Sequence, residues 1–176
     1  MKKTTWIART AICLALLVCL QYLTRGLGQL VTGSCVNLLL AVAALLGGVW
    51  SGVTVAALSP VFAKLLGIGP LWPLVPCVAL GNIVYAVLFA LLVRGLLQKQ
   101  RFPAAYGAMV LAAAAKFLTL WLALVKLAAP LVVPKPEMLS KITAMFTWPQ
   151  LITAVIGGAL ACVIAPLVEK ALKNRS

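Results

Sequence analysis

Long apolar runs, separated by short polar or glycine- and proline-rich stretches, are the feature that most limits how this chain can fold. A helix that crosses a membrane needs about 20 predominantly apolar residues. Of the 176 residues, 64% are hydrophobic and 10% are charged. A soluble domain commonly carries about a quarter charged residues. Because the chain lacks enough polar side chains to cover a globule, we expect lipid to be its main solvent.

The runs predict an all-α integral membrane protein, a six-transmembrane-helix bundle in a single membrane domain over residues 1–176. Glycines, prolines and polar residues mark the breaks between helices, and the segments 24–34 and 130–146 are expected to be connections. Only Gly47-Gly48 separates the second helix from the third, so one long helix is the alternative there. The expected helices cover residues 6–23, 35–47, 49–66, 72–97, 103–129 and 148–170.

The first run lacks a small-x-small cleavage site after it, so we expect a retained helix rather than a signal peptide. Basic residues then orient the bundle, because cytoplasmic segments carry an excess of Lys and Arg. With a cytoplasmic N-terminus, nine basic residues lie on inner segments: Lys2, Lys3, Arg9, Arg94, Lys99, Arg101, Lys170, Lys173 and Arg175. Five lie on outer segments: Arg25, Lys64, Lys126, Lys135 and Lys141. Both termini are therefore expected in the cytoplasm, and these positions beside apolar runs argue against a nucleic-acid partner.

The chemistry of the chain excludes several classes of membrane protein. There is no His, and the two acids, Glu137 and Glu169, lie in a connection and at a helix end. Proton-driven transporters usually carry a titratable acid or His inside the membrane, and hydrolases need an acid, a His or a metal. The five cysteines show no metal-binding spacing, and no phosphate-binding loop is present. We expect no enzyme activity, no metal and no cofactor.

Polar residues inside the expected spans gather in the half nearer the outer face. Lys116 lies 13 positions after Pro103, which places it ~20 Å from the inner face of a hydrocarbon core about 30 Å thick. Gln21 and Thr153 belong to the same half, and this asymmetry favours a pocket open to the outside over a continuous channel. The substrate contacts that we expect are Lys116, Asn82, Asn37, Gln150, Arg25, Tyr85, Trp148 and Lys64.

Each of these residues also has a structural explanation. Polar and aromatic side chains near helix ends anchor many membrane proteins at the interface, asparagines bond neighbouring helices, and a lysine can extend toward the interface. Lys116 is the hardest to explain in this way, because no span contains an acid to pair with it. A buried ammonium without a partner is costly, so we expect a substrate with an anionic group.

Small residues at Ala8, Ala11 and Ala15 form a stripe on the inner half of the first helix, where a second helix can approach closely. With this stripe, the segment Gly33-Ser34-Cys35-Val36-Asn37 leading into Leu46-Gly47-Gly48-Val49-Trp50-Ser51-Gly52, and Leu80-Gly81-Asn82, the chain resembles the S components of energy-coupling factor (ECF) transporters. The resemblance covers nearly the whole chain. S components are substrate-binding subunits that import vitamins and similar micronutrients across the prokaryotic plasma membrane.

The resemblance implies that the chain joins a transmembrane scaffold, the T component, and two ABC ATPases. It places Ala11 and Ala15 against the scaffold and the substrate near the outer face. Pantothenate, nicotinate, folate, lipoate and biotin all carry a suitable carboxylate. The alternative is a structural or assembly membrane protein of the cell-shape type, which has no small-molecule ligand.

The basic residues generate a prediction about topology. With both termini in the cytoplasm, a cysteine introduced at Ser140 should react with a membrane-impermeant maleimide added outside, and one at Gln100 should not. Labelling of intact cells checks this, with permeabilised cells as the control in which both positions react. The reverse pattern would place the polar half of the bundle on the cytoplasmic side.

Overall fold

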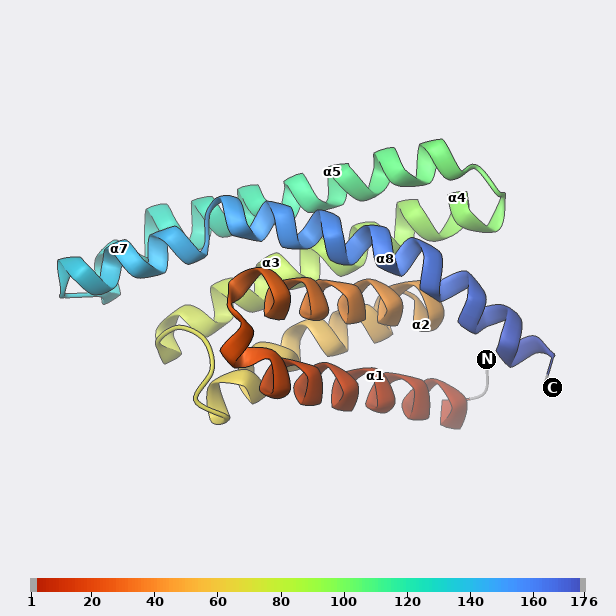
Figure 1. Ribbon diagram of the computed structural model, residues 1–176, viewed down its shortest axis with the longest axis horizontal. Helices are drawn as coiled ribbons and strands as arrows, with labels where there is room; N and C mark the ends of the chain where they lie inside the picture. Colours follow the sequence, from red (N-terminus) through yellow and green to blue (C-terminus); the bar gives the residue numbers. More distant parts are fainter. Residues whose placement is uncertain (1–2, 175–176) are drawn as a thin grey trace.

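The computed structural model describes residues 3–174 as a bundle of helices (Figure 1). The all-α prediction is confirmed for this part of the chain. Five helices in it are long and apolar enough to cross a membrane, whereas the sequence predicted six. Lys2 and Arg175, which contribute to the predicted orientation, lie outside the described residues.

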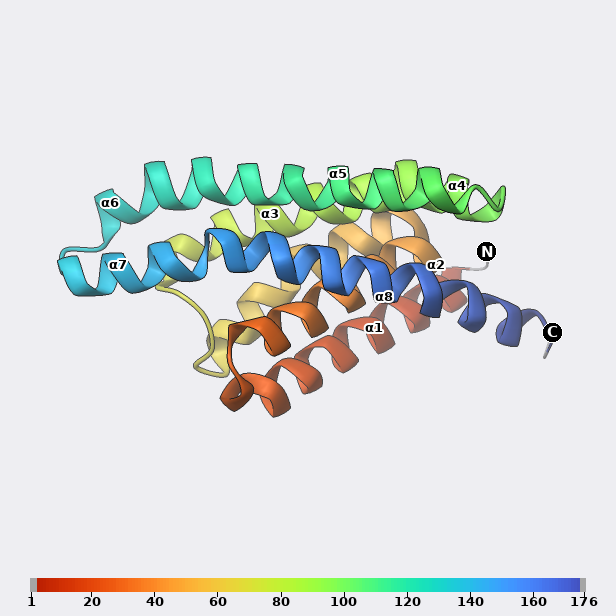
Figure 2. The same ribbon diagram turned by 45° about the horizontal axis from the view of Figure 1, so that its top comes forward.

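Prolines lie in the first turns of several helices, where the missing N–H has no helical partner to lose. Two π-helical segments, η3 and η4, continue α3 and α5 without a break in direction (Figure 2). The elements are α1 (Lys3–Thr24), η1 (Arg25–Leu27), α2 (Gln29–Leu65), η2 (Trp72–Leu74), α3 (Val75–Leu88), η3 (Phe89–Val93), α4 (Arg94–Gln98), α5 (Phe102–Leu120), η4 (Trp121–Ala128), α6 (Ala129–Val132), α7 (Pro136–Met145) and α8 (Trp148–Lys173).

Helix α2 contains a reversal at the glycine pair that separates the second and third expected helices. Gly48 has φ 79° and ψ −171°, a conformation that is accessible to glycine and strained for other residues. The two halves of α2 run side by side in opposite directions in Figure 1. A hydrogen bond from Thr10 Oγ1 to Ser51 Oγ, 2.9 Å long, ties α1 to the chain just after this reversal.

The structure corrects two of the expected connections. The segment 24–34 is mostly helical, because the turn at Gly28 (φ 90°) lets α2 begin at Gln29 rather than near Cys35. The segment 130–146 contains α6 and α7. Helix α7 forms because Ile142, and Phe146 just beyond the helix, are buried against Leu124 and Val133 at the same end of the bundle. Packing of apolar side chains thus overrides the proline signals in this segment.

The long helices pack around a main apolar core, and a smaller apolar cluster lies at the end of the bundle that holds α7. Helix α8 lies along the first half of α2 in both views (Figures 1 and 2). A Cβ at Gly157 of α8 would lie 2.6 Å from both Leu38 N and Ser34 O of α2. Backbone atoms cannot move aside as a flexible side chain can, so this glycine sets the distance between the two helices.

The connections fall at two ends of the bundle. The start of α1, the end of α8 and the turn between α4 and α5 lie together at one end (Figure 1). The opposite end holds η1, the turn after α2, and α7. The polar residues described next lie toward this second end.

The contact at Gly157 generates a prediction about stability. Gly157→Ala should lower the free energy of unfolding by about 1–3 kcal/mol, because the added methyl group forces α8 away from α2. Thermal unfolding in detergent measures the effect. Gly107→Ala in α5 is the matched control, since its Cβ would meet nothing within 4 Å. Equal melting temperatures for the two variants would contradict a fixed distance between these helices.

Candidate functional site

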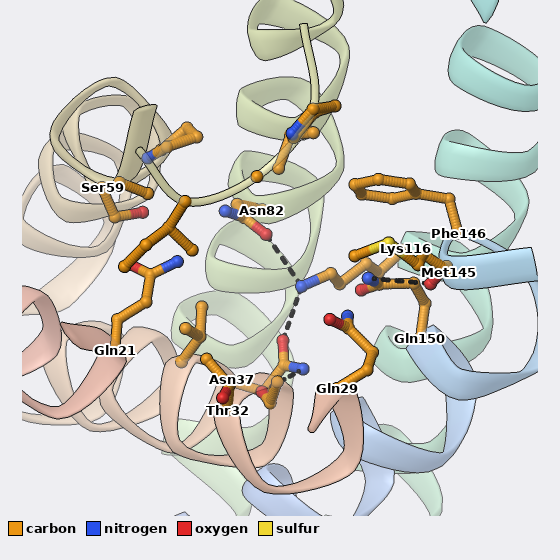
Figure 3. A pocket seen from close by; sticks show the side chains of 18 residues that line it. Gln21, Gln29, Thr32, Asn37, Ser59, Asn82, Lys116, Met145, Phe146 and Gln150 are labelled. Carbon is orange, nitrogen blue, oxygen red and sulfur yellow. Dashed lines mark hydrogen bonds between the residues drawn. The ribbon is translucent and has the colours of Figure 1, made fainter. Parts of the chain in front are cut away.

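A cavity of about 110 Å³ lies among the helices, and Figure 3 shows the side chains that line it. It lies in the half of the bundle that holds the end of α1 and the turn after α2. Six helical segments contribute to its wall: α1, the two halves of α2, α3, α5 and α8. The remaining wall comes from the turn after α2 and from the end of α7. The polar side chains on the wall are Gln21, Gln29, Thr32, Asn37, Ser59, Asn82, Lys116 and Gln150.

Lys116 of α5 is the central polar group of this cavity. Its side chain is 2% exposed. The ammonium donates hydrogen bonds to Asn37 Oδ1 at 2.5 Å and to Asn82 Oδ1 at 2.8 Å (Figure 3). The ring of Tyr85 lies 5.4 Å from Nζ, close enough for a cation–π interaction. A lysine ammonium has three N–H donors, so these two bonds leave one donor for the cavity.

A second layer of hydrogen bonds fixes the groups that hold Lys116. Asn37 Nδ2 donates to Gly33 O at 2.9 Å and to Thr153 Oγ1 at 3.2 Å, which turns the amide oxygen of Asn37 toward the lysine. The Tyr85 hydroxyl donates to Ala154 O at 2.7 Å. Because Thr153 and Ala154 are neighbours on α8, this helix positions both the amide and the ring.

Within the described residues, the ammonium of Lys116 has no carboxylate partner. The chain has two acids, and both are described. Glu137 is exposed on α7, and Glu169 lies near the far end of α8. An ammonium removed from water costs several kcal/mol, which neutral amide oxygens offset only in part. The site is therefore suited to binding an anion.

Four of the eight expected substrate contacts come together on the cavity wall: Lys116, Asn82, Asn37 and Gln150. Gln150 Nε2 donates to Met145 O at 3.4 Å, which links the start of α8 to the end of α7. The other four lie off the wall. As substrate contacts, all eight remain predictions.

Of the four residues off the wall, Tyr85 is fully buried behind Lys116. Arg25 is exposed and lies 4.2 Å over the ring of Tyr22. Trp148 is 67% exposed and stacks on Phe117, and Lys64 is half-buried near the end of α2. The structure separates these three interfacial residues from the cavity.

Several wall residues were not among the expected contacts. Gln29 and Thr32 fell in a segment read as a connection, and the early start of α2 brings them to the wall. Ser59 precedes Pro60 inside an apolar helix. An isolated polar residue in such a helix is the feature of the sequence that could have indicated a wall residue. Gln21 lies in the half of the bundle that the sequence predicts for it, although it is not among the expected substrate contacts. Met145 and Phe146 depend on α7, which the sequence did not predict.

The small-residue stripe lies elsewhere. Ala8, Ala11 and Ala15 are exposed on the surface of α1, toward the end opposite the cavity. Among the described residues no group of three or more His, Cys, Asp or Glu side chains lies close enough to hold a metal, and the five cysteines are free thiols.

Comparison with protein families identifies a match. The model of the family described as "ECF transporter, substrate-specific component" matches residues 6–169 of this chain. Comparison with curated proteins gave no match, and comparison with solved structures gave none either.

Proposed function

Because the chain belongs to the family of substrate-specific components of ECF transporters, we propose that it captures a small anionic, vitamin-like molecule in the cavity at Lys116. Members of this family are substrate-binding subunits rather than enzymes. The chain is a multi-pass membrane protein. The proposal rests mainly on the environment of Lys116. This residue is 2% exposed, and its ammonium has only neutral hydrogen-bond acceptors among the described residues.

Both the buried lysine and the exposed basic residues favour an anion. Two amide oxygens compensate only part of the free energy lost when an ammonium leaves water, and a bound carboxylate supplies the missing negative charge. The exposed basic residues near the same end, such as Arg25 and Lys126, raise the local concentration of anions. Lys116 is thus the anion contact, and Asn37, Asn82 and Gln150 bond the other polar groups of the substrate.

The proposed arrangement in the membrane has six crossings and both termini in the cytoplasm. The reversal at Gly48 supports it, since it divides α2 into two antiparallel helices. The start of α1 and the end of α8, which lie together at one end of the bundle, also support it. With this orientation the cavity faces the outside of the prokaryotic plasma membrane, where the substrate is captured.

The proposed partners are the transmembrane T component and two ABC ATPases. The ATPases would supply the energy for transport, because the sequence of this chain has no phosphate-binding motif with which to bind and hydrolyse ATP. The exposed alanines of α1 support a contact with the T component, because small side chains allow two helices to approach closely. Nothing observed favours the alternative of a structural protein without a ligand.

A lysine-to-methionine substitution tests the anion site. Lys116→Met keeps the side-chain length and removes the charge, so it should weaken binding of the substrate by roughly two to four decades. The bundle should remain folded, because its apolar core is unchanged, although the lost bonds to Asn37 and Asn82 should lower its melting temperature. Isothermal titration with the molecule released from the wild-type protein measures affinity, and thermal unfolding measures stability.

Lys126→Met is the matched control, since Lys126 lies on the same helical stretch but is exposed against Trp121. Its affinity should stay within a few-fold of the wild type at physiological salt. Unchanged affinity in Lys116→Met, or a cationic native ligand, would rule out the anion site.

The alanine stripe gives a separate prediction about assembly. Ala11→Leu or Ala15→Leu should reduce copurification with the T component while substrate affinity is unchanged, because the larger side chains hold two helices apart far from the cavity. Ile12→Leu, at an exposed position of the same helix, is the control of similar volume. Wild-type yields of the complex with both alanine variants would show that the stripe faces only lipid.

A further inference from the structure

The part of the cavity away from Lys116 is polar but uncharged, and we infer that the substrate is a monoanion that also carries a neutral hydroxyl or amide group. This inference rests on the proposed function and narrows its substrate class. It depends on three features of the wall: the charge of its residues, two polar atoms without partners, and the direction of one amide.

The wall of the cavity carries a single charged side chain among the described residues, that of Lys116. A second negative charge on the substrate would find no cation there, and an ammonium group would find no carboxylate. Each would be desolvated without compensation, at a cost of several kcal/mol. The wall therefore selects against dianions and against zwitterions such as free amino acids.

Two buried polar atoms of the wall residues lack hydrogen-bond partners in the described part of the chain. Ser59 Oγ and Gln21 Oε1 are buried and form no hydrogen bond, and the Ser59 side chain is 1% exposed. An unsatisfied buried polar atom costs about 1–3 kcal/mol, so such groups are rare in folded proteins. Ser59 lies on the second half of α2 and Gln21 on α1, and both lie on the same side of the cavity (Figure 3).

The amide of Asn82 connects the two sides of the cavity. Its oxygen accepts from Lys116, and its nitrogen points toward the side where Gln21 and Ser59 lie (Figure 3). A hydroxyl can donate and accept, and the terminal amide of Gln21 can present either atom after rotation. Gln21, Ser59 and Asn82 thus form a neutral subsite that matches a hydroxyl or an amide of the substrate.

Apolar side chains make up much of the remaining wall, among them Val36, Ile68, Val78 and Phe146. They suit a short hydrocarbon segment between the two polar groups of the substrate. The class that fits is a small carboxylate with a hydroxyl or amide at its other end.

The test begins with the protein purified in lipid nanodiscs. Small molecules released on denaturation are identified by mass spectrometry. We expect one that carries a single negative charge at neutral pH together with a hydroxyl or an amide. Pantothenate, biotin, nicotinate and lipoate are also screened for thermal stabilisation. Pantothenate and biotin have the neutral group, whereas nicotinate and lipoate do not.

Variants then locate the neutral subsite. Ser59→Ala and Gln21→Leu should each weaken binding of the identified molecule, or of the stabilising probe, by about 3- to 10-fold. An analogue without the neutral group should bind the wild type and Ser59→Ala equally, which a merely structural role of Ser59 would not produce. Ser34→Ala is the control, because the Ser34 hydroxyl bonds Leu30 O of its own helix. The ligand-free Ser59→Ala protein should melt no lower than the wild type.

The outcomes distinguish the neutral subsite from the substrate-binding role itself. A bound dianion, zwitterion or monoanion without a hydroxyl or amide would overturn this inference and leave a substrate-binding role intact. Full affinity in both Ser59→Ala and Gln21→Leu would do the same. No released molecule together with no stabilisation by any of the four probes would overturn the proposed function itself.

Discussion

The hydrogen bonds that hold the buried ammonium of Lys116 link most of the bundle. Three elements meet at Nζ, since α5 supplies the lysine and α2 and α3 supply Asn37 and Asn82. Helix α8 joins through Thr153 and Ala154, which bond Asn37 and Tyr85. In a low-dielectric interior these bonds are strong, and leaving any of them unmade is costly. The same network therefore aligns the helices and keeps one cationic donor directed at the cavity.

Close packing makes this network possible. Asn37 reaches Thr153 because α8 lies against the first half of α2, and Gly157, one turn further along α8, has room for no side chain. Gly33 lies opposite Thr153 in the same contact, where a Cβ would lie 2.9 Å from the threonine methyl group. Membrane helices commonly associate through small residues and interhelical hydrogen bonds, since lipid gives them no hydrophobic drive to associate.

The sequence predicted the all-helical class, and four of the eight expected contacts lie on the cavity wall. Both results follow from counting residues, which gives the length of a helix and the depth of a residue along it. The sequence did not separate the polar residues that line the cavity from those that lie off its wall. The helices are apolar on nearly every face, so periodicity does not say which way Ser59 or Gln21 points. Helix α7 was missed because its formation depends on the burial of Ile142 and Phe146 by distant segments. Arg25, Lys64 and Trp148 lie at the right end but off the wall, since depth alone does not separate an interfacial anchor from a cavity residue.

Beyond Lys116, toward the start of α1 and the end of α8, apolar side chains close the interior. Leu40, Val55, Phe89 and Val93 have no exposed surface and fill the space between the helices there. Among the described residues, the side chains that fill this half are mostly apolar and are poorly suited to replace the hydration shell of an ion. A bundle packed in this way would limit the leak of ions through its interior. A solute bound in the cavity could then cross only if the helices themselves moved apart.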